Sequence, residues 1–309
     1  MIWALGVLAA AVALVALGVR RQRARAEAAC PPVGRLIEVD GLKVHVLEAG
    51  RGPAVILIHG AGGNLRNFSF DLMARLAPQF RVIAFDRPGL GHSAPLPGHP
   101  APADQARHLA KAAAQLGAAP AVIVGHSFGA AVALGWPRDG SAAAIVTLGG
   151  AMMPYDGPLS SFYAATGSWW GRWTTAPLMS VFARKRDVAR ALGGIFAPQT
   201  PPPGYVEAIG APLTLRRRSL AENGRQVRGL SAALHLMAPD YPSLGIPVEV
   251  VHGLADSTCG ADLNARGIAS CLPRATLTLL PGVGHMPHHA DPEATQAAIT
   301  RAARSAGLI

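Results

Sequence analysis

The sequence AVIVGHSFGAAVALGW, residues 121–136, contains the patterns of a strand, a sharp turn and a helix in succession. Its first four residues are apolar and mostly β-branched, which is typical of a strand buried on both faces. The pentapeptide GHSFG interrupts this run, and the Ala/Val/Leu segment after it has a helical composition that ends at Trp136-Pro137. A G-x-S-x-G sequence between a strand and a helix indicates a nucleophile elbow, with the hydroxyl of Ser127 projecting from the turn.

Length and composition predict one large α/β domain with an insertion, since the chain has 309 residues, 50% of them hydrophobic and 15% charged. The formal net charge is +10, but the basic residues are dispersed and no aromatic-interleaved basic motif accompanies them. We therefore expect no nucleic-acid partner. Cys30, Cys259 and Cys271 have no metal-site spacing, and a disulfide between Cys259 and Cys271 remains open.

An uncharged apolar stretch occupies residues 2–19 and would reach about 27 Å as a helix, enough to cross a bilayer core. Four arginines follow it, at positions 20, 21, 23 and 25. The sequence predicts that residues 1–25 are a single-pass membrane anchor with a basic flank. A cleavable signal peptide fits less well, because no basic residue precedes the apolar run. The positive-inside rule places the rest of the chain on the cytoplasmic side of a bacterial-type inner membrane.

Strand and helix patterns alternate through residues 35–150 and 243–309, which predicts a mostly parallel eight-stranded sheet flanked by helices. The expected strands are 35–39, 42–47, 54–58, 81–85, 121–124, 143–148, 247–251 and 275–280. The expected helices around them are 65–77, 101–116 and 292–306. Asp40-Gly41 joins the first two strands as a hairpin, since this pair favours a two-residue turn.

The alternation fails in residues 151–242, which are rich in tryptophan, methionine and phenylalanine. An apolar, mostly helical segment inserted after the sixth strand predicts a lid over the crevice at the strand ends. Most of its aromatic residues are expected to form the core of the lid. Met152 and Met153 directly follow a strand, and we expect them to contact substrate.

Three chemically reactive residues each follow the end of a predicted strand: Ser127, Asp256 and His285. The carboxyl ends of parallel strands meet at one edge of a sheet, so these residues are expected to be neighbours. A serine hydroxyl needs a base, and the base needs a carboxylate to orient it. Other polar residues have simpler interpretations. Asp86 and His92 are expected to hold a loop by hydrogen bonds, and His288 and His289 to be loop residues rather than metal ligands.

The sequence resembles the lid-bearing α/β-hydrolase superfamily from residue 35 to the end. The resemblance is carried by HGAG at 59–62, DRPGLGHS at 86–93, GHSFG at 125–129, HGLAD at 252–256 and GHM at 284–286. It implies Ser127 as nucleophile, His285 as base and Asp256 as the residue that orients it. It also implies an oxyanion hole formed by the backbone amides of Ala61 and Phe128, with no cofactor and no metal. Epoxide hydrolases and haloalkane dehalogenases are disfavoured, because they carry aspartate at the elbow.

The resemblance predicts an enzyme that cleaves carboxylic esters of apolar small-molecule or lipid-like substrates through an acyl-enzyme. Hydrolysis of a carbon–carbon bond, a lactone or an amide, and cofactor-free perhydrolysis, use the same three residues and remain open. An acyltransferase and a non-catalytic binding protein are the further alternatives. The motifs do not separate these activities, because the differences lie in the lid and the acyl pocket.

Overall fold

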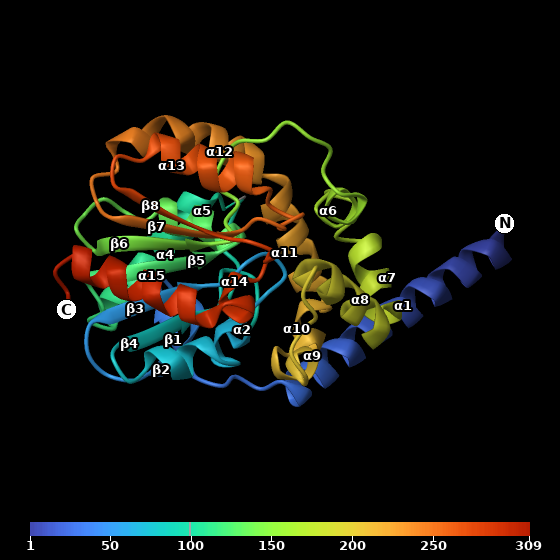
Figure 1. The fold of residues 1–309 in the computed structure, drawn as a ribbon. Coiled ribbons are helices and arrows are strands. Elements are labelled where there is room, and N and C mark those ends of the chain that lie inside the picture. Colours follow the sequence, from blue (N-terminus) through green and yellow to red (C-terminus); the bar gives the residue numbers. More distant parts are fainter. Residues whose placement is uncertain (99) are drawn as a thin grey trace.

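An eight-stranded, mostly parallel sheet forms the centre of the molecule (Figure 1). The computed structural model describes residues 1–98 and 100–309. The strand order is β1-β2-β4-β3-β5-β6-β7-β8; β2 runs antiparallel to β1 and β4, and the other neighbouring pairs are parallel. The strands are β1 (Arg35–Val39), β2 (Leu42–Ala49), β3 (Ala54–Ile58), β4 (Arg81–Phe85), β5 (Ala121–His126), β6 (Ala142–Leu148), β7 (Val248–Gly253) and β8 (Ala275–Leu280). The fold class predicted from the sequence is thus confirmed.

Helices cover both faces of the sheet, and the alternating side chains of each strand feed one core on each face. In β3, Val55 and Leu57 join the core under α3 and α15, whereas Ile56 and Ile58 join the core under α4 and α5. Besides the N-terminal helix, the described helices outside the lid are α2 (Arg66–Ser69), α3 (Leu72–Leu76), α4 (Pro102–Gln115), α5 (Phe128–Leu134), a π-helical segment (Asp262–Arg266), α13 (Gly267–Cys271), α14 (Pro287–Ala290) and α15 (Pro292–Ser305).

The segment 65–77, predicted as one helix, forms two short ones, α2 and α3. At Asp71 the backbone leaves the helical region, with φ −150°. Beside this break Phe70 packs edge-on against Tyr205, at 5.1 Å between ring centroids. Tyr205 lies far along the chain in the insertion, so this tertiary contact accompanies a break that the local pattern does not reveal.

The insertion between β6 and β7 is helical, as predicted, and lies at one end of the sheet (Figure 1). It contains α6 (Ser161–Thr166), α7 (Thr175–Phe182), α8 (Lys185–Phe196), α9 (Tyr205–Ala208), α10 (Ala211–Thr214), α11 (Arg217–Arg228), α12 (Leu230–Met237) and a 3₁₀ turn over Ala238–Ser243. We refer to these helices together as the lid.

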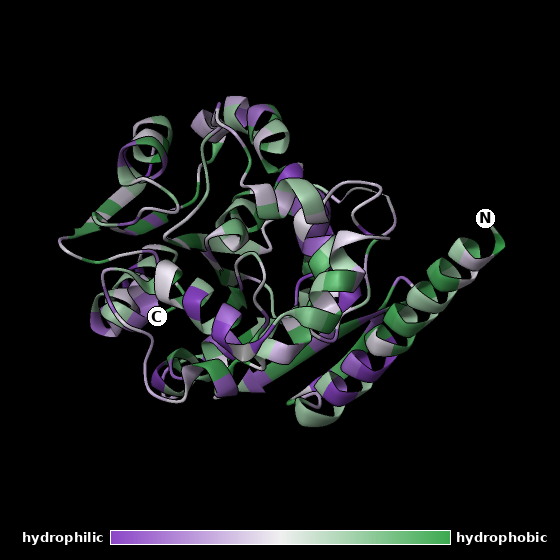
Figure 2. Ribbon diagram, turned by 90° about the vertical axis from the view of Figure 1, so that its right-hand side faces the viewer, coloured by the Kyte–Doolittle hydropathy of each residue, from purple (hydrophilic) through white to green (hydrophobic). Residues whose placement is uncertain are grey.

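The N-terminal helix α1 (Ile2–Ala29) is longer than the apolar stretch, because it continues without a break through the arginine-rich segment. Its N-terminal half extends beyond the rest of the molecule (Figure 1), and it is apolar there and polar further along (Figure 2). The helix is long and apolar enough to cross a membrane, as a signal sequence also would be. Its C-terminal half packs against α7 and α10 of the lid.

Candidate active site

Ser127 occupies the turn between β5 and α5 in a backbone conformation that residues with a side chain rarely adopt, with φ 53° and ψ −120°. The glycines on either side make this turn possible. A Cβ on Gly125 would overlap the carbonyl oxygen of Gly129, and a Cβ on Gly129 would overlap the carbonyl oxygen of Ile58. The tight turn raises the Ser127 hydroxyl clear of the backbone, as the G-x-S-x-G motif predicts.

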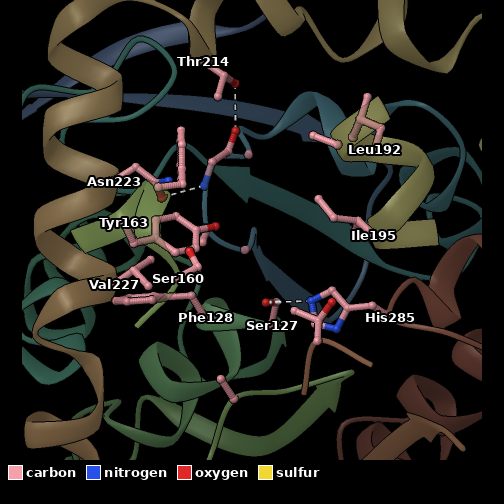
Figure 3. Close-up of a pocket in the computed structure, with 18 of the residues that line it drawn as sticks. Ser127, Phe128, Ser160, Tyr163, Leu192, Ile195, Thr214, Asn223, Val227 and His285 are labelled. Carbon is pink, nitrogen blue, oxygen red and sulfur yellow. Dashed lines mark hydrogen bonds between the residues drawn. The ribbon is translucent and has the colours of Figure 1, made fainter. Parts of the chain in front are cut away.

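His285 lies between Ser127 and Asp256. Its Nε2 is 2.9 Å from Ser127 Oγ, a contact drawn in Figure 3, and its Nδ1 is 2.8 Å from Asp256 Oδ2. All three residues are buried, and they follow β5, β7 and β8 at one edge of the sheet. The structure therefore brings together the three residues singled out from the sequence, in a geometry that lets Ser127 pass its proton to an oriented imidazole.

The Asp256 carboxylate is held by several donors besides His285. Its Oδ1 accepts the backbone N–H groups of Thr258 and Cys259 at 2.8 and 2.9 Å, and its Oδ2 lies 3.2 Å from His252 Nε2. Burial raises the pKa of this carboxyl, but hydrogen bonds from His252 and His285 outweigh burial and hold the pKa well below its usual range. Asp256 is thus an anion at neutral pH, which suits a residue that orients a base.

The glycine-rich loop after β3 lies directly against the elbow. A Cβ on Gly60 would lie 2.9 Å from the Cβ of Ser127, so only glycine permits this approach. Phe128 supplies the first N–H of α5, for which a helix has no internal acceptor. Ala61 and Phe128 both line the cavity beside Ser127, and their amides are the candidates for an oxyanion hole.

Two lid residues that the sequence did not single out fix this loop from the other side. Asn223 of α11 accepts the N–H of Gly62 at its Oδ1, at 2.6 Å, and Thr214 of α10 donates its hydroxyl to the carbonyl oxygen of Gly62, at 2.7 Å (Figure 3). Both sides of one residue's backbone are therefore held by the lid. No local pattern marks these residues, because they lie more than 150 positions from Gly62.

A cavity of about 750 Å³ separates the sheet edge from the lid and includes Ser127 and His285 in its wall. This volume is in the range of sites for small molecules. Most of the exposed wall area is apolar, but polar side chains also line the cavity, among them Asn67, Ser160 and the carboxylate of Asp187. The apolar side chains include Phe128, Tyr163, Leu192, Ile195, Val227 and Leu230.

The model of the alpha/beta hydrolase family matches residues 55–298 of this sequence. The chain belongs to the alpha/beta hydrolase family. The match covers the elbow, the glycine-rich loop, the lid and all three residues of the hydrogen-bonded chain, so the protein is a hydrolase by family.

Individual proteins and solved structures are also similar to this hydrolase. Polyketide synthase ThaQ from Burkholderia thailandensis is 31% identical over 269 residues, which are 81% of this chain but only 12% of ThaQ. The crystal structure of a membrane phospholipase A, a bacterial virulence factor, is similar with a TM-score of 0.68 at 20% identity, covering 99% of this chain and 97% of that one. A thermophilic esterase from Thermogutta terrifontis gives 0.67 at 22% identity, covering 88% and 99%. At these identities the structures show a shared fold.

Met152 and Met153 of the hydrolase do not line the cavity, contrary to the sequence-based expectation. The chain turns at Gly149 and Gly150, and Met152 becomes fully buried beneath the turn. The backbone N–H groups of both methionines instead approach Asn264 Oδ1, at 2.8 and 3.3 Å. Tyr155 and Leu159, further along the same segment, line the cavity in their place.

His288 and His289 lie in the short helix α14 rather than in a loop, and they pack beneath the site. The ring of His126 lies 4.7 Å from that of His288, which lies 4.2 Å from that of His289. Burial lowers the pKa of His126 to about 3 and that of His289 to about 4, and it lowers the pKa of His288 well below the usual value. These three histidines are uncharged at neutral pH. His288 and His289 act as packing residues, whereas His126 also lines the cavity and donates its Nε2–H to the carbonyl oxygen of His285, at 3.0 Å.

Asp86 holds the loop after β4, as predicted. Its Oδ1 accepts the N–H of Leu65 at 2.8 Å, its Oδ2 accepts the N–H of His92 at 2.7 Å, and His45 Nδ1 donates to Oδ2 at 2.6 Å. The His92 ring in turn donates to the carbonyl oxygen of Cys30 at 2.9 Å. This network ties the end of α1 to the hydrolase core.

The structure also bears on the cysteines and on whether the chain could bind a metal ion. Cys30, Cys259 and Cys271 are all free, so the pairing of Cys259 with Cys271 left open by the sequence does not form. Within residues 1–98 and 100–309, no group of three or more histidine, cysteine, aspartate or glutamate side chains could hold a metal ion.

Proposed function

We propose that this hydrolase cleaves carboxylic esters of apolar small-molecule or lipid-like substrates, with Ser127 as nucleophile. The observation that carries the proposal is the 2.9 Å separation of Ser127 Oγ and His285 Nε2 in the wall of a largely apolar cavity. An apolar wall favours an acyl chain or another hydrocarbon group, because burying such a group is favourable by about 0.8 kcal/mol for each CH₂. The anionic Asp256 beside His285 supports the role of His285 as a base.

In the proposed mechanism, His285 Nε2 accepts the Ser127 proton while Oγ attacks the ester carbonyl carbon. Asp256 stabilises the imidazolium, and the amides of Ala61 and Phe128 bind the negative oxygen of the tetrahedral intermediate. Collapse of this intermediate breaks the bond to the alcohol, which leaves with the proton from His285. A water molecule then gives a proton to His285 and attacks the carbonyl carbon of acyl-Ser127. As the bond to Ser127 Oγ breaks and the acid leaves, His285 returns that proton to Oγ and restores the free enzyme.

The proposal is tested by labelling the purified chain with a fluorophosphonate and reading its intact mass. We expect one adduct on the native chain and none on Ser127→Ala. Ser160→Ala is the matched control, because it removes a second serine that lines the cavity, and it should still take one adduct. Label that persists in Ser127→Ala would reject Ser127 as the nucleophile. A series of p-nitrophenyl esters of increasing chain length then tests the preference for apolar acyl groups.

We further propose that α1 anchors the hydrolase in a membrane. The helix has 28 residues, and its most apolar 18-residue window has a mean hydropathy of 2.5 and no buried residue. Its C-terminal half is part of the folded protein, because Gln22 donates to the carbonyl oxygen of Pro212 and Glu27 pairs with Arg216 of the lid. These contacts favour an uncleaved helix over a signal sequence.

Flotation of the full chain with lipid vesicles tests the anchor, and the intact mass of the protein from cells tests cleavage. We expect the chain to float with vesicles and to keep residues 1–25. A mature protein that begins near residue 26 would instead identify a signal sequence. The cytoplasmic orientation is a separate prediction, tested by protease protection in sealed inner-membrane vesicles.

A further inference from the structure

The lid exposes a cluster of large apolar side chains on and just before α7. Its members are Trp169, Trp170, Trp173, Leu178 and Phe182, with exposed fractions of 80, 48, 57, 47 and 66%. We call this cluster the lid patch. Several large apolar side chains left exposed within one short segment of a folded protein are typical of a site of interaction, because such surface is costly to leave in water.

Helix α7, which carries part of the lid patch, packs against α1 near Gly18 and Gln22. A Cβ on Gly18 would lie 2.9 Å from Val181 of α7, and Gln22 accepts the hydroxyl of Ser180, also of α7, at 3.3 Å. Helix α7 therefore lies against α1 where the apolar residues 2–19 give way to the arginines. In a spanning helix, this is the level at which the hydrocarbon core meets the headgroups.

We propose that the lid patch lies in the interfacial layer of the bilayer that α1 enters, so that its partner is a lipid surface. This inference rests on the anchor and on the lipid-like substrate of the proposed function. Tryptophan is the side chain most typical of this layer, because its ring is apolar and its N–H can stay hydrated. Arginines accompany the patch: the guanidinium groups of Arg172 and Arg217 lie 4.9 and 4.6 Å from the ring centre of Trp173. Their charges suit lipid phosphates.

The same helix also forms part of the cavity wall. Met179 of α7 and Ala183, the residue directly after that helix, line the cavity. Each directly follows an exposed member of the patch, Leu178 or Phe182. The next helix, α8, continues the wall with Val188 and Leu192. A patch immersed at the interface would thus place the cavity wall next to the acyl chains, and an ester dissolved in the bilayer could enter without crossing water.

The test is tryptophan quenching in the full chain, reconstituted into phosphatidylcholine and phosphatidylglycerol vesicles that carry spin-labelled lipids. Trp3→Phe is the background, since it removes the tryptophan of α1 and leaves Trp136, which is buried in the core, and the three of the patch. We expect a spin label near the headgroup to quench most of the emission of this variant and a deep label to quench less. Replacing the three patch tryptophans by phenylalanine as well should abolish the quenching, because only Trp136 remains.

A Trp3→Phe chain that floats with vesicles but shows no quenching would overturn the inference while leaving the anchor intact. Cross-linking between two copies of the chain without quenching would also overturn the inference, because it would mean that a second copy covers the patch. Quenching without ester cleavage by the native chain would instead reject the proposed function alone, because quenching requires no turnover.

A second measurement compares two substrates in the Trp169→Ser/Trp170→Ser variant. We expect slower cleavage of an ester dissolved in vesicles and unchanged cleavage of a short, water-soluble ester. Leu236→Ser is the matched control: Leu236 is 82% exposed on α12 of the lid, outside the patch, and both rates should stay unchanged. An equal loss on both substrates in the tryptophan variant would contradict the inference.

Discussion

Asn223 of the lid accepts a hydrogen bond of 2.6 Å from the backbone N–H of Gly62, which follows the proposed oxyanion-hole residue Ala61. Thr214 holds the carbonyl oxygen of the same glycine. The lid therefore does more than cover the cavity, because it fixes the loop whose amide is proposed to bind the developing oxyanion. Any movement of α10 or α11 relative to the sheet would also move this loop.

We expect Asn223→Ala and Thr214→Val each to lower kcat by about tenfold to a hundredfold, the loss typical of a misplaced catalytic group. KM should change little, since the oxyanion forms only on the way to the transition state. The effects should not add in the double variant, because both residues hold one glycine. Steady-state kinetics on a soluble ester measures this, with Arg228→Ala, an exposed change on α11, as control. A rise in KM at constant kcat would show that Asn223 binds substrate instead.

Replacing Ser127 should reveal the free energy stored in the elbow. Ser127 has φ 53° and ψ −120°, a region that is open to glycine and costs other residues about 1 to 3 kcal/mol. The free energy of unfolding of Ser127→Gly should therefore exceed that of Ser127→Ala by about 1 kcal/mol, after the greater chain entropy of unfolded glycine is counted. In urea unfolding, the glycine variant should accordingly unfold at the higher denaturant concentration. Both variants lack the hydroxyl, so the comparison isolates the backbone. Equal stability would mean that the turn stores no such free energy.

Truncation of α1 should distinguish the roles of its N-terminal and C-terminal halves. A chain that begins at residue 18 loses the exposed apolar part but keeps Gln22, Ala26 and Glu27 against the lid. We expect it to leave the membrane and to cleave a soluble ester at the native rate. A chain that begins at residue 30 also leaves the buried guanidinium of Arg216 without Glu27, and we expect it to be less stable by about 1 to 3 kcal/mol. Urea unfolding of the two chains tests this, and equal stability would contradict it.

Acid should destabilise the fold through the buried histidines. His59, His126 and His289 have pKa values lowered by burial to about 3, 3 and 4, so they stay neutral in the folded chain. The unfolded chain protonates them below pH about 6.5 and thus binds more protons. The free energy of unfolding should be unaffected by these groups above that pH and should fall as the pH drops from about 6.5 towards 4.

His289→Phe tests this linkage at one position, since His289 already packs among aromatic rings, including Phe196 and Tyr205. Each such histidine contributes a slope of at most about 1.4 kcal/mol per pH unit. Urea unfolding between pH 7.5 and 4.5 should show a shallower fall for the variant. An unchanged slope would mean that His289 does not take part in the linkage.

Features that depend on short, local patterns were predictable from the sequence. The strands at 54–58, 81–85 and 275–280 have the bounds that their sequence patterns predicted. Ser127, Asp256 and His285 were found because each follows such a strand, and a parallel sheet gathers these positions at one edge. The family resemblance added their proposed roles.

Features that depend on contacts between distant segments were not predictable. Asn223 and Thr214 are ordinary lid residues until the fold places them beside Gly62. Met152 follows a strand, as a substrate-contacting residue would, but the turn at Gly149 and Gly150 directs it into the core. The break near Asp71 and the contact of α1 with the lid likewise depend on tertiary packing, which the hydrophobic periodicity of the sequence does not reveal.

The short link between α1 and the sheet has a kinetic consequence. Only residues 30–34 connect the helix to β1, which is at most about 17 Å of chain, and the bond from His92 to Cys30 pins its start. An enzyme that α1 anchors as proposed would meet membrane-dissolved esters only in the plane of its own membrane. Its rate on such esters would follow their mole fraction in that membrane, and dilution of the suspension with buffer would leave that rate unchanged.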